Sequence, residues 1–418
     1  MTDAEPLRVT ILIVGDELLA GEIADRNGPF FAEQLTGRGF RVQEVRILPD
    51  ETDTLTDAVR GALAHSTLTV VCGGLGPTSD DRTTEAVALA LGRETVRDED
   101  AWQHIRGIFG MRNIEPPPGN EKQAFIPTGA EVLPNLRGTA PGYLVTEGAS
   151  AIAVLPGPPR ENRPLFTDVL LPRLADLSGD APLLETRVFR VFGLPESEVG
   201  SRLRGVEARF PALRFGYQAR FPEILVKIRH DTATRGPAEA AAGALREALA
   251  PHLYVEGDTT LPEVLGRSLE RRALRIVTAE SCTGGLAAKL LTDIPGSSAW
   301  MERGFVTYTN AAKIELLGVD EALLADHGAV SEPVAEAMLA GALERSPADV
   351  GVAITGIAGP TGGTADKPVG TVCIAWGDRQ LTKARTTRFP FDRELNRLVS
   401  AWAAFGRLYR HIHRSAQA

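Results

Sequence analysis

The chain has 418 residues and a formal net charge of −9, and at roughly 150 residues per domain it predicts two or three domains. With 43% hydrophobic and 24% charged residues, it can bury substantial cores. The acidic balance disfavours broad nucleic-acid binding, and no apolar run reaches the ~20 residues of a membrane span. Three cysteines are an odd, sparse set that indicates a reducing cytoplasm. We therefore expect a cytoplasmic protein without membrane or direct nucleic-acid partners.

The N-terminal region alternates strands with helices, which predicts a parallel sheet with helices on both faces. Ligands of such sheets bind beyond the carboxyl ends of the strands, where polar and glycine-rich segments fall at 15–17 and 73–81. A Pro- and Gly-rich stretch then runs from Pro116 to Glu161 and constrains the chain by its turns. The predicted elements are a strand at 8–14, a helix near 28–38, a strand at 42–48, a helix near 52–65, a strand that stops at Gly73, and a helix within 80–92.

Four carboxylates follow the ends of two of these strands. Asp16 and Glu17 come after the first strand, and Asp80 and Asp81 after the third. Carboxylates at adjacent strand ends suit a hard divalent cation whose coordination is completed by substrate phosphates. Acidic residues also cap helices, and Asp80 and Asp81 precede one, so capping remains an open explanation.

The pattern of predicted elements changes near residue 177, where strands and an Ala-rich helix at 237–250 predict a small α+β module. It contains no GXXG loop or aromatic RNA platform, and we interpret it as a structural or dimer-forming connector. A second alternating pattern starts near residue 259 and predicts another sheet. Its predicted elements are a helix at 260–272, a strand at 274–279, a helix opened by ESCTGG, a strand near 304–308, a helix at 333–345, and strands at 350–355 and 369–376.

The chain closes with an amphipathic helix that predicts a cap on the domain with a solvated basic side. Its apolar face carries Leu398, Trp402, Phe405, Tyr409 and Ile412.

Ser281 lies just after the predicted strand at 274–279, and Thr283, Gly284 and Gly285 follow at what should be a helix start. A serine at a strand–turn–helix junction exposes its hydroxyl beside free backbone amides, the arrangement of a nucleophile with an oxyanion hole. The segment differs from a G-x-S-x-G elbow, because Ala279 and Thr283 occupy the glycine positions. Helix capping by Ser281 is equally compatible with this segment taken alone.

A histidine is a poor candidate for the base of such a serine, because none lies near a glycine-rich motif and His327 is expected at the end of a helix. Lysine is the other option. Lysine acts as a base only if burial lowers its pKa from ~10.4 toward ~7–8. Lys289 is expected on a solvated helix face, whereas Lys313 lies between an apolar strand and an apolar helix. Cys282, next to Glu280, is a rival nucleophile, although a buried structural cysteine is commoner.

Several segments together resemble the C-terminal domain of CinA proteins, the nicotinamide-nucleotide amidohydrolase family, over roughly residues 258–413. They are AESCTGGLAAKLLTDIPGSS, YTNAAKIELLGV, GAVSEPVAEAMLAGA, TGIAGPTGGTADKPVGTV and FDRELNR. The resemblance implies that nicotinamide mononucleotide is deamidated without a cofactor, with Ser281 as nucleophile and Lys313 as base. The other implied catalytic residues are Tyr308, Thr355 and Arg393, with Arg397 close enough to compete for the last role. The implied substrate-binding residues are Thr283, Gly284, Gly285, Gly356, Gly359, Gly362, Gly363 and Thr364.

The N-terminal segments GDELLAGEIADRN, GGLGPTSDDRTTEA, NEKQAFIPTGAEVLPNLRGTAPGY and LPGPPRE resemble the other CinA domain, over about residues 6–175. That domain is related to molybdopterin-binding domains. The resemblance implies a metal-dependent ADP-ribose pyrophosphatase, with Asp16 and Asp81 as ligands of a divalent metal ion. Asn162 stands where the family usually has methionine, which weakens inferences about that edge of the site. The implied nucleotide-lining residues are Gly73, Gly74, Gly76, Thr78, Gly138, Thr139, Gly142, Gly157 and Glu161.

The predicted fold class is α/β, with two α/β domains of largely parallel sheets at 1–175 and 258–418, joined by the α+β module at 176–257. We expect a homodimeric enzyme of pyridine-nucleotide salvage that acts on nicotinamide mononucleotide and ADP-ribose. One alternative is a nucleotide-binding regulatory protein of competence or the DNA-damage response, with an inactive N-terminal site. Another is a molybdopterin adenylyltransferase, which rests on fold similarity alone.

Overall fold

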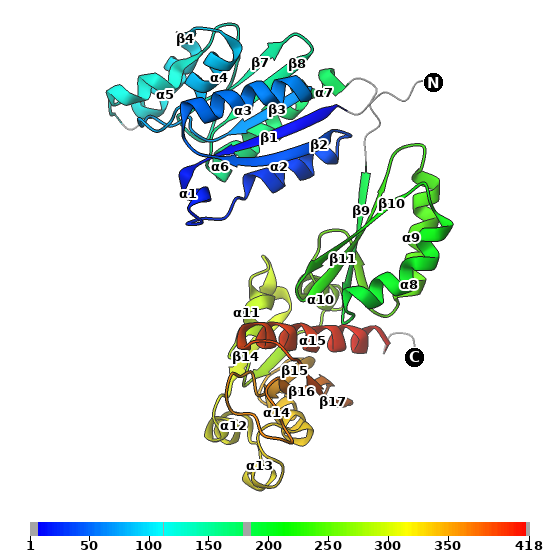
Figure 1. Ribbon diagram of the computed structural model, residues 1–418. Coiled ribbons are helices and arrows are strands. Elements are labelled where there is room, and N and C mark those ends of the chain that lie inside the picture. The colour runs from blue at the N-terminus through cyan, green and yellow to red at the C-terminus, as the bar shows by residue number, and fades with distance from the viewer. Residues whose placement is uncertain (1–6, 112, 179–184, 415–418) are drawn as a thin grey trace. The chain divides into compact units, whose positions relative to one another are not determined.

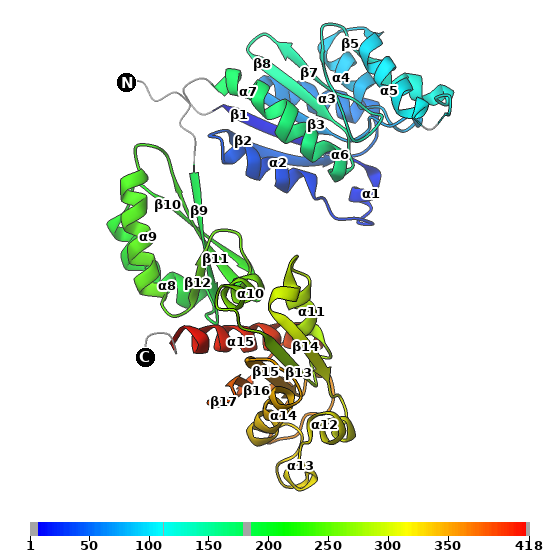
Figure 2. The same ribbon diagram turned by 180° about the vertical axis from the view of Figure 1, so that it is seen from behind.

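The computed structural model describes residues 7–111, 113–178 and 185–414 (Figures 1 and 2). It divides into two compact units, residues 1–185 with 231–233, and the remainder of the chain. Each unit contains an α/β sheet, so the predicted fold class is confirmed. No helix within the described ranges is long and apolar enough to cross a membrane.

The first unit is built on a six-stranded sheet in the order β2-β1-β3-β8-β7-β6. Its first four strands in that order run parallel, and the last two are antiparallel to their neighbours. The strands are β1 (Arg8–Val14), β2 (Arg41–Leu48), β3 (Leu68–Cys72), β6 (Glu131–Leu133), β7 (Gly142–Glu147) and β8 (Ser150–Leu155), with a separate pair β4 (Thr95–Arg97) and β5 (Phe125–Pro127). The α-helices are α1 (Asp16–Leu19), α2 (Asn27–Thr36), α3 (Thr52–His65), α4 (Thr83–Leu91), α5 (Glu99–Gly110), α6 (Pro159–Pro164) and α7 (Leu171–Ser178).

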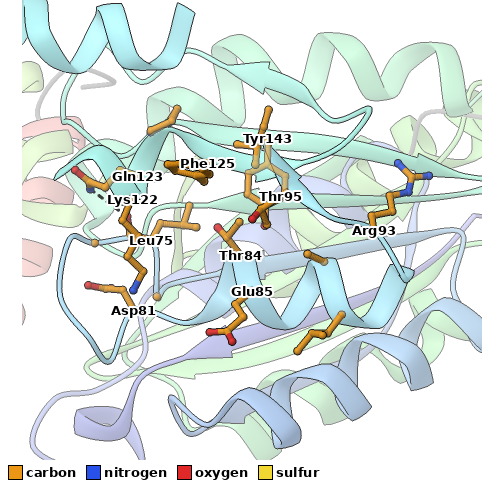
Figure 3. A pocket seen from close by; sticks show the side chains of 16 residues that line it. Leu75, Asp81, Thr84, Glu85, Arg93, Thr95, Lys122, Gln123, Phe125 and Tyr143 are labelled. Atoms are coloured by element: carbon orange, nitrogen blue, oxygen red, sulfur yellow. Dashed lines mark hydrogen bonds between the residues drawn. The ribbon is translucent and has the colours of Figure 1, made fainter. Parts of the chain in front are cut away.

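Both faces of this sheet are covered, as the alternating pattern predicts. Ile11 and Ile13 of β1 pack with α2 and α7, whereas Leu12 and Val14 pack with α3 and α4. This division follows from the two-residue period of a strand. A pocket of about 430 Å³ lies between α4, β5 and β7, and Figure 3 shows Thr84 on the helix below Tyr143 on the strand.

The Pro- and Gly-rich stretch contains strands that the sequence pattern did not predict. β8 lies beside β3 in the middle of the sheet, and its residues 151–155 are buried. The six-residue run SAIAVL is short and bounded by turns, so its length alone did not separate it from a loop.

The second unit contains the C-terminal sheet, in the order β14-β13-β15-β16-β17. β13 lies parallel between β14 and β15, while β16 and β17 continue the sheet antiparallel. The strands are β13 (Ile276–Glu280), β14 (Met301–Val306), β15 (Val350–Gly356), β16 (Thr371–Asp378) and β17 (Thr382–Arg388). The helices are α10 (Leu261–Arg271), α11 (Leu286–Thr292), α12 (Asn310–Leu317), α13 (Glu321–His327), α14 (Glu332–Glu344) and α15 (Arg393–Arg414).

The middle module has its own sheet and core but belongs to the second unit. Its strands follow the order β10-β11-β9-β12. Phe192 of the module packs on Trp402 of α15, with ring centroids 5.7 Å apart. The elements are β9 (Glu185–Phe192), α8 (Glu196–Arg209), β10 (Arg214–Arg220), β11 (Glu223–His230), α9 (Arg235–Leu249) and β12 (Leu253–Glu256).

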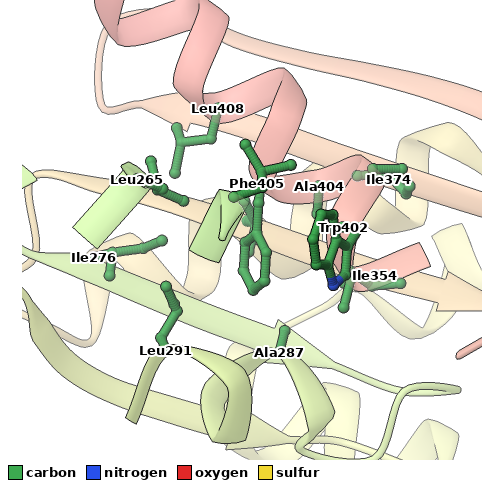
Figure 4. Packing of buried hydrophobic residues seen from close by; sticks show 14 of the residues in the cluster. Leu265, Ile276, Ala287, Leu291, Ile354, Ile374, Trp402, Ala404, Phe405 and Leu408 are labelled. Carbon is green, nitrogen blue, oxygen red and sulfur yellow. The ribbon is translucent and has the colours of Figure 1, made fainter. Parts of the chain in front are cut away.

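Helix α15 is more deeply buried than the sequence predicts. Figure 4 shows Trp402, Ala404, Phe405 and Leu408 among residues of the sheet, α10 and α11. Ala401 and Ala403 are buried as well, and the predicted solvated basic side is wrong for Arg407, whose side chain is largely covered. The sequence pattern shows only one apolar face, because small alanines and an arginine stem can be buried without a strong hydrophobic signal.

Candidate active site

Ser281 occupies a tight turn between β13 and α11. Its N–H donates to the Ile354 carbonyl at 2.9 Å, which holds the turn against the end of β15. Gly284 and Gly285 then adopt positive φ angles of 59° and 90°, a region that favours glycine. Helix α11 begins at Leu286, directly after these glycines as the sequence predicts, so Ser281 lies in the turn and is not the N-cap.

Glu280 takes the role of holding the helix start. Its buried carboxylate accepts the N–H groups of Ala287 at 2.9 Å and Ala288 at 2.8 Å. These are among the first N–H groups of a helix, which have no partner within the helix itself. The carboxylate is therefore committed to the backbone, and it fixes the direction in which the chain leaves Ser281.

Lys313 of α12 reaches the serine directly. Its Nζ donates to Ser281 Oγ at 3.0 Å and to the Thr307 carbonyl at 2.9 Å. The side chain is only 1% exposed, and this burial holds the pKa of the amine below its ordinary value. No carboxylate lies within ion-pair distance of Nζ in the described part of the chain. The arrangement favours a neutral amine that accepts the serine proton.

The turn leaves backbone donors beside the serine. Among the described residues, the N–H groups of Cys282, Thr283 and Gly285 donate to no other group of the protein. The buried hydroxyls of Thr283 and Thr307 also have no hydrogen-bond partner there. Buried polar groups are normally paired, so these atoms mark a place where a ligand or water completes the bonding.

Two alternative residues fit the chemistry less well. Cys282 is buried, and burial raises the pKa of its thiol to about 12, so little thiolate is present at neutral pH. Lys289 is exposed and pairs with Asp293 at 2.5 Å, as its predicted solvated position requires.

Two arginines at the start of α15 contact this region. Arg393 donates to the Tyr308 hydroxyl at 3.2 Å and to the Gly359 carbonyl at 2.8 Å, so it joins two other predicted site residues. Arg397 donates to the Thr283 carbonyl at 3.2 and 2.7 Å, directly on the serine turn. The sequence named Arg397 only as the competitor of Arg393, yet each arginine holds a different part of the site.

The glycine-rich loop is only partly drawn into this cluster. Thr355 is buried at the end of β15, and its hydroxyl donates to the Ala329 carbonyl at 2.8 Å. Thr364 exchanges hydrogen bonds with Lys367 and is exposed, as are Gly362 and Gly363. Of the predicted loop residues, the structure therefore brings Gly359 toward Arg393 and leaves Gly362, Gly363 and Thr364 exposed to solvent.

An acidic cluster lies at the carboxyl ends of the strands in the first unit, around a pocket of about 690 Å³. Asp16 and Asp50 each donate a backbone N–H to the other's carboxylate, at 3.1 and 3.4 Å. Burial and the charges of Asp16, Glu17 and Asp80 raise the pKa of Asp50. The sequence analysis missed Asp50, although it follows β2 as Asp16 follows β1.

Asp81, the other predicted metal ligand, is turned into its own loop. Its Oδ2 accepts from both the N–H and the hydroxyl of Thr78, and a Cβ on Gly76 would lie 2.4 Å from the same oxygen. No group of three or more His, Cys, Asp or Glu side chains in the described ranges is gathered tightly enough to hold a metal. Carboxylate oxygens are nevertheless the type of donor that a hard divalent cation prefers.

The glycines of this unit serve different purposes. A Cβ on Gly73 would lie 2.3 Å from the Val14 carbonyl and one on Gly74 would lie 2.3 Å from the Thr83 hydroxyl, so both allow a close turn at the acidic pocket. Gly157 lines the same pocket. Gly142 instead packs inside the sheet, where a Cβ would lie 2.7 Å from the Val154 carbonyl.

Three other predicted residues, Gly138, Thr139 and Glu161, line neither of the two pockets. The buried carboxylate of Glu161 accepts from Asn135 at 3.0 Å and leaves no room for a Cβ on Gly138, which is followed by the half-buried Thr139. Asn162, at the position that departs from the family pattern, donates to the Gly157 carbonyl at 2.6 Å. The departure thus places an amide against the pocket's edge.

The pocket in Figure 3 adjoins the acidic one, because Gly74 and Asp81 line both. Lys122 lines it too and donates to the Thr78 carbonyl at 2.8 Å, which places one positive charge beside the glycine turn. The two pockets together offer adjacent space with carboxylates at one end and a lysine near the turn.

Comparison with known proteins divides the chain in the same way. Residues 258–412 match the family model "CinA C-terminal domain", and residues 10–176 match "Probable molybdopterin binding domain". Together they cover the two α/β regions and leave out the middle module.

Full-length relatives match as well. A "Putative competence-damage inducible protein" of Symbiobacterium thermophilum is 44% identical over 88% of this chain and 88% of its own length. A "CinA-like protein" of Geobacter sulfurreducens is 40% identical over 97% of this chain and 99% of its own. Among solved structures, competence/damage inducible protein CihA from Agrobacterium tumefaciens is 45% identical, covering 36% of this chain and 96% of its own, with a TM-score of 0.35.

Proposed function

This chain belongs to the CinA family, and from that premise we propose that its C-terminal site deamidates nicotinamide mononucleotide to nicotinate mononucleotide and ammonia. One observation carries the proposal. A buried lysine amine, with no carboxylate of the described residues in ion-pair distance, lies 3.0 Å from the hydroxyl of a serine on a strand–turn–helix junction. That pairing activates a nucleophile for acyl transfer, because the amine can take the hydroxyl proton as the oxygen attacks.

The reaction divides into two steps. Neutral Lys313 takes the proton from Ser281 while Oγ bonds to the carboxamide carbon, and backbone amides of the turn stabilise the oxyanion. The carbon–nitrogen bond then breaks, the Lys313 ammonium gives its proton to the leaving nitrogen, and ammonia departs. Water attacks the resulting ester, again with Lys313 as base, and restores the free serine.

The two arginines at the start of α15 have different roles in this proposal. We assign the 5′-phosphate to Arg393, which is exposed and whose contacts within the chain are to neutral groups. Arg397 instead fixes the Thr283 carbonyl and so keeps the turn in shape. Charge-assisted bonds from a guanidinium to phosphate orient a ligand strongly.

The decisive experiment measures ammonia release from nicotinamide mononucleotide, without added metal, by wild type, Ser281→Ala and Cys282→Ala. We expect loss of activity in Ser281→Ala only. Loss in Cys282→Ala alone would overturn the choice of nucleophile. An inactive wild-type protein would remove the amidohydrolase proposal and move attention to the first unit or to a binding role.

We propose a second activity for the first unit, the hydrolysis of ADP-ribose to AMP and ribose 5-phosphate. The supporting observation is the acidic pocket, where burial and then three neighbouring carboxylates raise the pKa of Asp50, and no cation of the protein is paired with that residue in the described part of the chain. A divalent ion bound there would neutralise the pyrophosphate and polarise it for attack. The glycine turn at Gly73 and Gly74 gives phosphates close access to the backbone.

The test follows AMP production from ADP-ribose with and without Mg²⁺ or Mn²⁺, in wild type and Asp16→Asn. Metal-dependent turnover that Asp16→Asn loses supports the enzyme. ADP-ribose binding without turnover would favour a nucleotide-binding regulatory protein. Binding of molybdopterin with adenylyl transfer would favour a molybdopterin adenylyltransferase.

A further inference from the structure

A separate pocket of about 530 Å³ lies between the middle module and helix α15 in the second unit. None of its lining residues belongs to the Ser281 turn, to α12 or to the glycine-rich loop. Its volume is in the range of pockets that bind small organic molecules, roughly 300–1,000 Å³. The site therefore has room for a ligand that the proposed deamidation does not use.

Aromatic side chains form its walls. Phe221 of the middle module and Phe391 before α15 meet edge to face, with ring centroids 4.9 Å apart. These two rings remain 39% and 41% exposed, although large apolar side chains are usually covered. Phe192 and Phe389 complete an apolar surface contributed by both parts of the unit. A flat aromatic ligand would cover the exposed rings.

Arg407 of α15 brings a positive charge to this surface. The guanidinium of Arg407 stacks on Trp376 at 5.2 Å and donates to the Thr387 hydroxyl at 2.5 Å and the Arg385 carbonyl at 3.4 Å. All of these partners are uncharged groups, and no carboxylate lies within 4.0 Å of Arg407 among the described residues. Burial, with Arg385 and Arg410 nearby, lowers the pKa of Arg407 to about 10.

The acidic residue that lines the pocket does not neutralise the charge of Arg407. Glu223 is the acidic side chain among the lining residues, and it is buried in an ion pair with Arg190 at 2.7 Å. It also accepts from the Tyr254 hydroxyl. Because this carboxylate is already paired with Arg190, it does not neutralise Arg407, whose guanidinium gives the pocket a positive charge. A buried charge without a counter-ion is costly, and a ligand anion would relieve that cost.

We propose that this pocket binds a small aromatic anion, with its ring against Phe221 and Phe391 and its anionic group on Arg407. The aromatic surface and the unpaired guanidinium select together for a ligand that has both parts. A neutral aromatic satisfies only the first, and an inorganic anion only the second.

The test uses two fluorescent probes that share one ring system. 8-Anilinonaphthalene-1-sulfonate carries an anion, and N-phenyl-1-naphthylamine lacks it. Each is titrated into the folded full chain carrying Ser281→Ala, so that the result does not depend on the deamidase reaction. We expect one saturable site that prefers the sulfonate by about tenfold, because a charge-assisted bond is stronger than a neutral one.

Variants locate that site. Arg407→Gln keeps a donor for Thr387 and removes the charge, so it should lower sulfonate affinity about tenfold and leave the neutral probe unchanged. Ala219→Trp narrows the pocket and should weaken both probes. Arg271→Gln, an exposed arginine on α10, is the matched control. If Arg407→Gln fails to fold, Arg410→Gln tests the same charge preference.

Three results would overturn the proposal. They are equal affinity of wild type for the two probes, unchanged sulfonate affinity in the folded arginine variants, and the absence of a saturable site. An effect of Arg271→Gln as large as that of Arg407→Gln would also do so, because general surface charge would then explain the binding.

Discussion

The two α/β sheets place their candidate sites at equivalent positions and give them opposite electrostatics. In each, a central strand is flanked by two parallel neighbours, and the site lies where these strands end. The first unit gathers carboxylates at a wide pocket and raises the pKa of Asp50. The second buries one amine against one hydroxyl and lowers the pKa of Lys313.

The difference shows how one type of sheet supports two kinds of chemistry. Neighbouring carboxylates repel one another, and a bound cation would relieve that repulsion in the first site. In the second site the protein supplies both the amine and the hydroxyl, and burial lowers the pKa of the amine. What distinguishes the two is the depth at which the polar groups sit behind the strand ends.

The largest expected effect concerns the buried amine. Lys313→Ala should lower ammonia release by about 10³-fold, because it removes the general base. Lys313→Arg should be as inactive, since a guanidinium does not release its proton. The matched control is Lys289→Ala, an exposed lysine that pairs with Asp293, which should keep full activity. A Lys313→Ala protein that remains active would break the comparison between the two sites.

The core that supports the second site should be equally sensitive. Phe405 is fully buried on α15 among residues of the sheet, α10 and α11 (Figure 4). Phe405→Ala should lower the free energy of unfolding of this unit by about 3–5 kcal/mol through the cavity that it leaves. Denaturant titration followed by tryptophan fluorescence measures the change. Phe391→Ala, whose ring is half-exposed, should cost far less, and equal costs would contradict this account of the core.

The pH dependence sharpens the contrast between amine and carboxylates. Because Lys313 must be neutral, kcat/KM for deamidation should rise about tenfold per pH unit below the pKa of the amine and level off above it. Burial lowers that pKa, so the midpoint should fall below the ~10.4 of an ordinary lysine. A rate that falls as the pH rises through this limb would show that the protonated amine is the active form.

The stability should follow the same titration with a definite sign. The unfolded chain binds a proton on Lys313 more readily than the folded chain, so the lysine destabilises the fold most at low pH. This cost disappears as the pH approaches ~10.4. The difference in thermal midpoint between Lys313→Met and wild type should therefore shrink from pH 7 to pH 10. A difference that is constant across this range would mean that the amine is not shifted.

The smallest effect is expected at the acidic pocket. Asp50→Asn relieves the repulsion from Asp16, Glu17 and Asp80. It should raise metal-free stability by less than ~1 kcal/mol and weaken Mn²⁺ binding several-fold. Calorimetric titration measures the binding. Asp53→Asn, on the exposed side of α3, is the control, and an equal loss of binding in both variants would argue against a defined cation site.

The residues themselves established much of the architecture. The run RVTILIV predicted β1, and the segments with helical and strand periods placed most of the two sheets. The family resemblance, carried by the segments around Ser281, Lys313 and Gly73, is confirmed by the matches to both domains. Period, turn residues and motifs are local signals, which is why they could be seen in one dimension.

Other features depended on contacts between distant parts of the chain. These features are the position of β8, the burial of Arg407, the reciprocal hydrogen bonds between Asp16 and Asp50, and the hydrogen bonds of Glu280 to the start of α11.

The Ser281–Lys313 pair shows where sequence reasoning stops. The sequence alone predicted a serine at a strand end and a lysine in a half-apolar segment 32 positions later. Only the tertiary structure brings the two atoms to 3.0 Å and buries the amine. The pKa of a lysine depends on desolvation and on nearby charges, and both are decided by residues that folding brings together from outside the motif.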